Sequence, residues 1–297
     1  TPPYEPIGRS KCVGCGFRDR CGAEAEAHDD VARIYGVDQG LARELHERGV
    51  STVQDLLGRF TPATLASVER PWGASFQRVG RRAERILLQA RAMAGEMEIV
   101  RGRPRLPAGE NFVMFDVEGM PPYLDELDKV YLWGIQVFGA RPGPYQAAVA
   151  GFGADGDQRR WRGFLALARK IFAEHGDIPF VHWHHYETAK LRAYVDRHGD
   201  AGGTATRVQR NCLDLLPITR DAIVLPTPSY SLKVVEQHVG YRRTLDEYGG
   251  DWSMARYIEA TEAGDEAERR AIMNEILAYN REDLEATWAV LEWLRRT

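Results

Sequence analysis

The stretch that decides the fold is NFVMFDVEG, residues 111–119. Its apolar and aromatic residues predict a buried strand, and two acids, Asp116 and Glu118, stand near its end. Side chains at positions i and i+2 of a strand share a face, so these carboxylates point the same way. Burying them together is costly unless a cation neutralises them, so the stretch predicts a metal site. The alternative is a solvent-exposed strand end with two ordinary charges.

The sequence beyond this strand predicts an α/β fold, with a mixed sheet flanked by helices. Two further strands follow the first closely, and strands then alternate with helices. The expected strands are residues 111–119, 129–139, 145–152, 178–183 and 207–216. The expected helices are residues 157–175, 186–199 and about 267–295.

Two later segments add acids to this pattern. Tyr279 and Asp283, in LAYNREDLEAT, are four residues apart and share a helix face beside an apolar stripe. Glu187, in VHWHHYETAKL, follows a middle strand. Each has an ordinary reading by itself, as a surface acid or a core tyrosine. Their fixed order along the chain predicts an acidic site where the sheet meets the last helix.

In this order the motifs resemble those of the DnaQ-like 3′–5′ exonucleases, which have a ribonuclease H-like fold. The Tyr-x-x-x-Asp motif places the resemblance in their DEDDy subclass. More closely, the chain is similar to the YprB-type ribonuclease H-like domain, which in bacterial proteins lies behind a RecB-like nuclease domain and ahead of a superfamily 1 helicase. The phrases that carry this likeness are NCLDLLPITRD (211–221), TPSYSLKVVEQHVGY (227–241) and YNREDLEAT (279–287).

The resemblance implies a site for two divalent cations, Mg²⁺ or Mn²⁺. Asp116, Glu118, Glu187 and Asp283 would be the ligands, and Tyr279 would orient the attacking water. The second motif departs from the family, which has aspartate where this sequence has Glu187. The longer side chain can still bind a metal, but with a different geometry.

Three further residues each have two interpretations. Asp214 resembles a subfamily position close to the site, but it would equally cap a helix before Pro217. Lys233 would reach a substrate phosphate or a metal-bound carboxylate. His184 belongs to a histidine cluster in which zinc is the alternative; because spacing offers no third ligand, we expect a nucleic-acid contact.

Cys12, Cys15 and Cys21 form a C-x2-C-x5-C pattern that favours metal over a disulfide. The trio resembles the end of a RecB-like nuclease domain with a four-iron cluster, whose fourth cysteine lies far upstream. We therefore expect the chain to be a segment of a longer protein, and any iron–sulfur cluster or zinc to belong to that parent protein. A zinc site completed by His28, or three empty thiols, are the alternatives.

Residues 31–57 resemble a helix-hairpin-helix, with Gly36 in the hairpin turn. A weaker second copy surrounds residues 79–90, where Arg81 and Arg82 would line one side. Hairpin glycines let backbone N–H groups approach a DNA phosphate without reading the sequence. A helical bundle used as a spacer is the alternative.

These observations divide the chain into four expected segments. They are a cysteine-containing tail (1–27), a small helical helix-hairpin-helix-like domain (28–100), a linker (101–110) and a ribonuclease H-like exonuclease domain (111–297).

Composition limits the class of protein. Residues 59–105 hold 10 basic and 4 acidic residues, whereas the whole chain of 297 residues has a net charge of −4. A basic block beside an acidic one fits a nucleic-acid enzyme, and a solvated helical surface is the alternative. The longest apolar runs, such as IPFVHW (178–183), are too short to span a bilayer, and no signal peptide is evident, so we expect a cytoplasmic protein.

The sequence therefore predicts a metal-dependent 3′–5′ exonuclease that hydrolyses DNA, at single-stranded ends, in repair or processing. Its expected partners are DNA and fused or neighbouring RecB-like nuclease and helicase domains. Two alternatives stay open: a catalytically weak nucleic-acid-binding scaffold, and an exonuclease that trims RNA.

Overall fold

The computed structural model describes residue 12 and residues 15–121, 128–149, 154–244 and 249–297. The chain forms two compact units. The N-terminal unit comprises Thr1–Arg103 and Arg220–Tyr230, and the sheet unit comprises Pro104–Thr219 and Ser231–Thr297. The chain therefore passes from one unit to the other three times. None of the described helices is long and apolar enough to cross a membrane.

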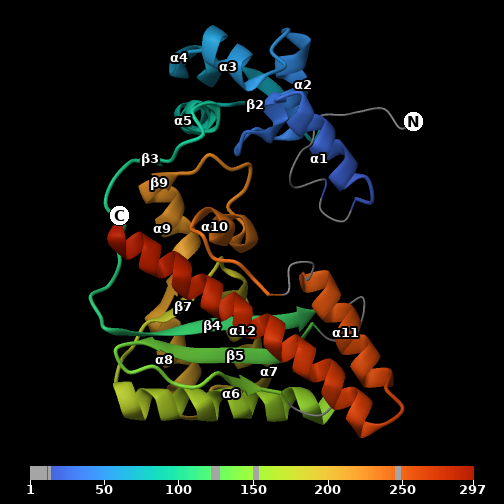
Figure 1. The fold of residues 1–297 in the computed structure, drawn as a ribbon, viewed down its shortest axis with the longest axis vertical. Helices are drawn as coiled ribbons and strands as arrows, with labels where there is room; N and C mark the ends of the chain where they lie inside the picture. Colours follow the sequence, from blue (N-terminus) through green and yellow to red (C-terminus); the bar gives the residue numbers. More distant parts are fainter. Residues whose placement is uncertain (1–11, 13–14, 122–127, 150–153, 245–248) are drawn as a thin grey trace. The chain divides into compact units, whose positions relative to one another are not determined.

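The sheet unit is built on five strands in the order β6-β5-β4-β7-β8 (Figure 1). The first three strands along the chain pair antiparallel, and the last two add in parallel. This confirms the expected mixed sheet. The strands are β4 (Asn111–Met120), β5 (Lys129–Gly139), β6 (Gln146–Ala148), β7 (Phe180–His182) and β8 (Cys212–Asp214).

The two faces of β4 have different partners. Val113, Phe115 and Val117 join the main core together with aromatic residues of α6 (Ala154–His175). On the opposite face, Phe112 lies 6.3 Å from Trp288 of α12 (Glu266–Arg296), measured between ring centroids. Figure 1 shows α12, in red, running across β4 and β5. The alternation of the strand therefore turns Asp116 and Glu118 toward α12.

The remaining helices of the sheet unit surround this frame. They are α7 (Tyr186–His198), η2 (Ala201–Gly203), α8 (Thr204–Asn211), α9 (Leu215–Ala222, which continues into the N-terminal unit), α10 (Leu232–His238) and α11 (Gly250–Glu262). The expected helices at 157–175, 186–199 and 267–295 are confirmed within a few residues.

Three expected strands were too long. The predicted strand 178–183 is confirmed over Phe180–His182. Of the predicted strand 207–216, only Cys212–Asp214 pairs with β7, and the preceding residues form α8. Ala205 and Val208 are buried on one side of that helix, so the segment is amphipathic with a helical period. The predicted strand 145–152 is confirmed over Gln146–Ala148, and residues 150–152 lie outside the described residues.

The N-terminal unit is mainly helical. Its helices are α1 (Arg18–Ala27), η1 (Val31–Arg33), α2 (Gln39–Glu47), α3 (Val53–Arg59), α4 (Pro62–Ala66) and α5 (Arg82–Ala94). Thr52 and Thr61 form capping boxes at the starts of α3 and α4. An apolar core that includes Ile34, Leu41 and Ile86 joins η1, α2, α3, α4 and α5.

The N-terminal unit also contains strands that its sequence does not predict. β1 (Glu69–Trp72) and β2 (Ser75–Arg78) form an antiparallel hairpin, and β3 (Ile99–Val100) pairs with β9 (Ile223–Val224). Only Arg70 is buried in the hairpin, so its sequence lacks the alternating apolar pattern by which half-buried strands are found.

Candidate active site

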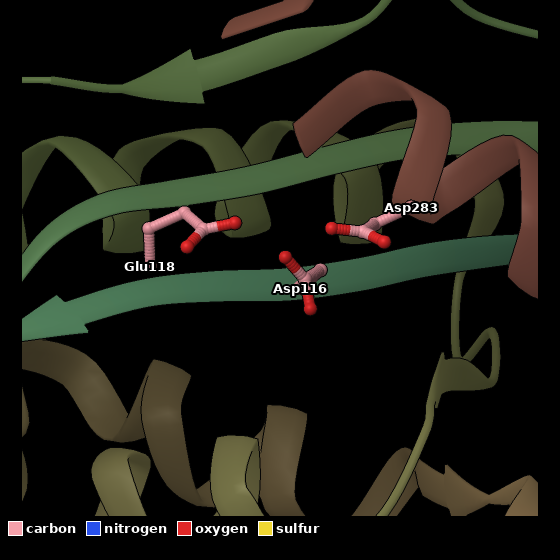
Figure 2. A group of neighbouring side chains, drawn as sticks. All are labelled: Asp116, Glu118 and Asp283. Carbon is pink, nitrogen blue, oxygen red and sulfur yellow. The ribbon is translucent and has the colours of Figure 1, made fainter. Parts of the chain in front are cut away.

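Asp116, Glu118 and Asp283 bring their carboxylates together between β4 and α12. Each offers an oxygen that lies within 4.8 Å of the other two, and Figure 2 shows the three groups turned toward one another. Opposite oxygens around one Mg²⁺ are about 4.2 Å apart, so small side-chain rotations would bring this set to metal-binding distances. Hard carboxylate oxygens are the ligands that Mg²⁺ and Mn²⁺ favour.

The three carboxylates line a cleft of about 450 Å³. Tyr279 and Glu187 line the same cleft, so all five residues expected for catalysis share one cavity. The other lining residues are Val117, Gly119, Pro121, Asp128, Tyr186, Lys190, Gly250, Asp251 and Met254.

Burial and mutual repulsion raise the pKa values of these carboxylates. Burial, followed by the charges of Asp283 and Glu118, raises the pKa of Asp116 well above its usual range. Burial and Asp283 raise the pKa of Glu118 to about 8. A bound dication would reverse this preference for the protonated form, so the donor set fits a divalent metal.

Arg243 brings a positive charge to this site. Arg243 donates to Asp283 Oδ1 at 2.6 Å and, through two nitrogens, to both oxygens of Glu236 at 2.6 and 2.7 Å. Burial opposes the charge of Arg243, but Glu236 and Asp283 raise its pKa far above the usual value. Burial raises the pKa of Asp283, and Arg243 partly offsets this shift. Arg243 therefore shares one positive charge between Glu236 and Asp283, so it offsets the charge of Asp283 only in part and the cleft keeps an excess of negative charge.

Asn280 holds the carboxylate of Asp116 in place. Its fully buried amide donates to Asp116 Oδ2 at 2.6 Å and accepts from the Tyr145 hydroxyl at 2.9 Å. Gly134 pairs with Asp116 across β4 and β5, and a Cβ there would collide with the Asn280 amide. The glycine thus makes room for the hydrogen bond that orients the acid.

Glu187 lines the cleft but is not one of the three clustered carboxylates. It is buried at the start of α7, and its Oε2 lies 3.3 Å from His182 Nδ1. Burial raises the pKa of Glu187, and His182 partly opposes the shift. Burial also disfavours the charge on His182, yet Cys212 and Glu187 raise its pKa to about 10. Glu187 thus faces the imidazole of His182 as well as the cleft.

Tyr279 is buried beside the three acids. Burial and the charges of Asp283 and Glu118 raise its pKa far above the usual value, so the phenol is protonated at neutral pH. Lys233 Nζ lies 5.5 Å from its ring centroid. Burial and Arg243 lower the pKa of Lys233. Lys233 therefore lies next to the predicted catalytic tyrosine.

The structure shows the surroundings of Asp214 and His184, two residues whose roles the sequence left open. Asp214 Oδ1 accepts hydrogen bonds from the backbone nitrogens of Leu216 and His184, which is a capping arrangement. His184 has an exposed side chain and a positive φ of 75°, and its carbonyl accepts from His182 Nδ1. It does not line the cleft, so its predicted contact with nucleic acid stays a prediction.

The residues predicted for other sites lie in the N-terminal unit. Cys12, Cys15 and Cys21 have no disulfide partners, and among the described residues they do not form a three-ligand group. The expected cluster or zinc stays a prediction. Gly36, with a φ of +100°, lines a pocket of this unit together with Arg81 and Arg82.

Sequence reasoning missed Arg243 and Asn280. Asn280 is three residues before Asp283, and that helical spacing was the available signal that it faces the site. Arg243 lies in a loop whose distance from α12 depends on the tertiary fold, and no local pattern marks it.

Comparison with known proteins identifies the family of the sheet unit. A family model described as RNase_H superfamily matches residues 113–295. Searches of curated proteins and of solved structures found no match. The matched segment contains the sheet, α12 and every residue of the acidic cleft, and it covers more than half of the chain. The chain belongs to the ribonuclease H superfamily.

Proposed function

We propose that the chain is a metal-dependent 3′–5′ exonuclease that removes nucleotides from single-stranded DNA ends. The observation that carries the proposal is the buried group of Asp116, Glu118 and Asp283, each with an oxygen within 4.8 Å of the others. Membership of the ribonuclease H superfamily supports a metal-dependent nuclease. The 3′–5′ polarity rests on the resemblance to DnaQ-like exonucleases, and the DNA substrate rests on the resemblance of residues 31–57 to a helix-hairpin-helix.

In this proposal Asp116, Glu118 and Asp283 would hold two divalent cations, and Glu187, which lines the same cleft, would contribute a further carboxylate. The chemistry that such cations supply when bound is activation of the attacking water and stabilisation of charge on the leaving oxygen. Asn280 keeps Asp116 oriented through its hydrogen bond, and Arg243 fixes Asp283.

Tyr279 acts as a hydrogen-bond donor. Its raised pKa keeps the phenol protonated, so it orients the water or a phosphate oxygen rather than removing a proton. The ammonium of Lys233, beside the ring of Tyr279, supplies positive charge for the substrate phosphate.

The wider context of the enzyme also belongs to the proposal. It acts in DNA repair or processing in the cytoplasm, next to RecB-like nuclease and helicase segments, with any cluster on Cys12, Cys15 and Cys21 completed by a longer parent protein.

The test compares Asp116→Asn and Asp283→Asn with Asp196→Asn, a control on the exposed side of α7. The substrates are 5′-labelled and 3′-labelled DNA and RNA oligonucleotides with Mn²⁺. We expect both site variants to lose cleavage while the control keeps it. The 5′-labelled DNA should yield a ladder of shortening products. Metal-dependent activity retained by both site variants would falsify the assignment, and preferential RNA trimming would change the substrate.

One observation favours a second candidate, a scaffold that binds nucleic acid with little cleavage. Arg243 already pairs with Asp283, and His182 Nδ1 lies 3.3 Å from Glu187 Oε2, so two of the four predicted ligands already have a basic neighbour within the chain. Calorimetric titration with Mn²⁺ separates the two functions. Binding that Asp116→Asn removes supports the nuclease, and no heat at millimolar Mn²⁺ supports the scaffold.

A further inference from the structure

The N-terminal unit contains a pocket of about 480 Å³ that the acidic site does not use. Its walls come from the turn before α2, the end of β1, the first turns of α5 and the start of the segment 220–230. All of these belong to the N-terminal unit. The lining residues are Tyr35, Gly36, Val37, Asp38, Trp72, Arg81, Arg82, Arg85, Ile86 and Arg220. The volume lies within the range of small-ligand sites.

Trp72 provides a flat aromatic surface in this pocket. It is 49% exposed, which is unusual for so large an apolar side chain. The guanidinium of Arg70 lies 4.6 Å from its ring centroid, and Arg70 is itself only 2% exposed. A buried cation therefore holds one face of the indole, so the ring is fixed while half of its surface stays open.

Positive charge exceeds negative charge around this ring. Asp38 is the only acid in the lining, and its Oδ2 already accepts from Arg70 at 2.9 Å and from Arg82 at 3.1 Å. Arg81 is exposed and makes no ion pair with any residue that the structure describes. Two guanidiniums thus share one carboxylate, and Arg81 adds a further positive charge at the rim.

The other two arginines in the lining, Arg85 and Arg220, contact residues of the same unit. Arg85 donates to the backbone carbonyl of Arg220 and lies 3.5 Å from the exposed carboxylate of Asp221. Arg220 stacks over Tyr35 at 5.1 Å from the ring centroid. The pocket therefore combines a fixed aromatic platform with fixed positive charges, which reduces the ordering cost of binding a polyanion.

We propose that this pocket binds single-stranded nucleic acid, with a base stacked on Trp72 and the adjoining phosphates on Arg81 and Arg82. Aromatic platforms beside positive charge are the common means of holding single strands without sequence preference. A duplex fits less well, because its bases are already stacked on one another and cannot cover an indole face.

This contact differs from the one expected of a hairpin glycine. The carbonyl of Gly36 accepts from Arg82 at 3.2 Å, and a Cβ at Gly36 would lie 3.2 Å from the Ile86 side chain. The glycine therefore serves the packing of the turn against α5. The available recognition groups are side chains: the indole of Trp72 and the guanidinium of Arg81.

The test measures binding of the full chain in EDTA, so that it does not depend on the acidic site or on cleavage. The probe is a fluorescein-labelled oligothymidylate of about twelve nucleotides, followed by anisotropy. We expect Trp72→Ala to weaken binding roughly 5- to 150-fold, the usual loss for one stacked base. Arg81→Ala should reduce the slope of log K against log salt by about 0.7.

The chain offers two matched controls. Phe76 is 70% exposed on the same hairpin, but its register with Pro71 places it on the face opposite Trp72. Phe76→Ala should change affinity by less than about twofold. Arg91 is exposed in the last turn of α5, away from the pocket, and Arg91→Ala should leave binding unchanged.

Three results would overturn the proposal. The first is binding by Trp72→Ala and Arg81→Glu within twofold of the parent protein. The second is equal or tighter binding of a blunt duplex of the same length. The third is displacement of the oligonucleotide by polyglutamate at lower concentration, which would mark the pocket as a site for an acidic protein. Arg81→Glu keeps the test decisive if Trp72→Ala does not fold, because Arg81 is exposed.

Discussion

The acidic cleft of the sheet unit is lined by Asp116, Glu118 and Asp283. The arginine pocket of the N-terminal unit is the pocket around Trp72 and Arg81. Both sites are charged, but they differ in burial. Glu118 and Asp283 are 7% and 8% exposed, so their unbalanced charge appears as raised pKa values. The side chain of Arg81 is exposed to solvent, where an unpaired charge costs little free energy. The comparison teaches that an excess of buried charge of one sign requires a specific counter-ion. An excess of exposed positive charge instead attracts a polyanion.

Chelation should separate the two sites most strongly. Removing divalent metal with EDTA is expected to reduce hydrolysis by at least about 10³-fold, because the catalytic cations stabilise charge by several kcal/mol. Oligothymidylate binding should change by less than about twofold, since the pocket around Trp72 uses arginine. Parallel cleavage and anisotropy assays measure both effects. An equal loss of binding and cleavage would mean that the two sites are one.

Asn280→Ala tests the orientation of the acidic site. Losing the hydrogen bond to Asp116 should lower activity about 10- to 100-fold, the usual effect of removing a partner of a metal ligand. A positioning role also predicts a weaker apparent Mn²⁺ affinity, measured by metal titration of the rate. Asn274→Ala, on the exposed side of α12, is the control. Full activity with unchanged Mn²⁺ dependence would remove Asn280 from the site.

Gly134→Ala examines the same hydrogen bond from the opposite strand. The added Cβ would collide with the Asn280 amide, and overpacking of this kind lowers the free energy of unfolding by about 1–3 kcal/mol. Adding Asn280→Ala should restore much of that loss, because it removes the colliding group. Urea unfolding measures both variants. Gly163→Ala in α6, where a Cβ finds ordinary contact, should be neutral or stabilising. Additive losses in the double variant would contradict this account.

The smallest expected effect is on stability as a function of pH. The pKa of Glu118 is raised from 4.5 to about 8, so the folded protein keeps a proton that the unfolded chain releases. Without metal, the free energy of unfolding should therefore fall as the pH rises from 4.5 to about 8, by about 1 kcal/mol or more. Thermal unfolding at several pH values measures this slope.

Glu118→Gln should flatten that slope, whereas Glu174→Gln, an exposed acid on α6, should not. Mn²⁺ should raise the melting temperature more at pH 8 than at pH 5, because the ionised carboxylates are its ligands. A stability that rises over this range in metal-free protein would show that the buried acids are neutralised by other means.

The parts of the fold that sequence could predict have strong periodicity. β4 is a long apolar strand, and α12 has a continuous helical stripe, so both were recognised and they supply Asp116, Glu118 and Asp283. The exposed hairpin of Trp72 has no such stripe. Arg243 reaches Asp283 through tertiary contacts that no local window contains. Local patterns thus placed the three clustered carboxylates on recognisable elements, and only the fold revealed Asn280 and Arg243, which hydrogen-bond to them.

The threefold passage of the chain between its units limits how the protein can be divided. A cut near residue 103 would leave the N-terminal piece without residues 220–230, which contain β9 and Arg220. β3 would lose its only described pairing partner, and Gln89 would lose the carbonyls of Leu225 and Thr227. The pocket around Trp72 is therefore completed by residues that lie within the segment 113–295 matched by the ribonuclease H family model, so no single cut separates the two.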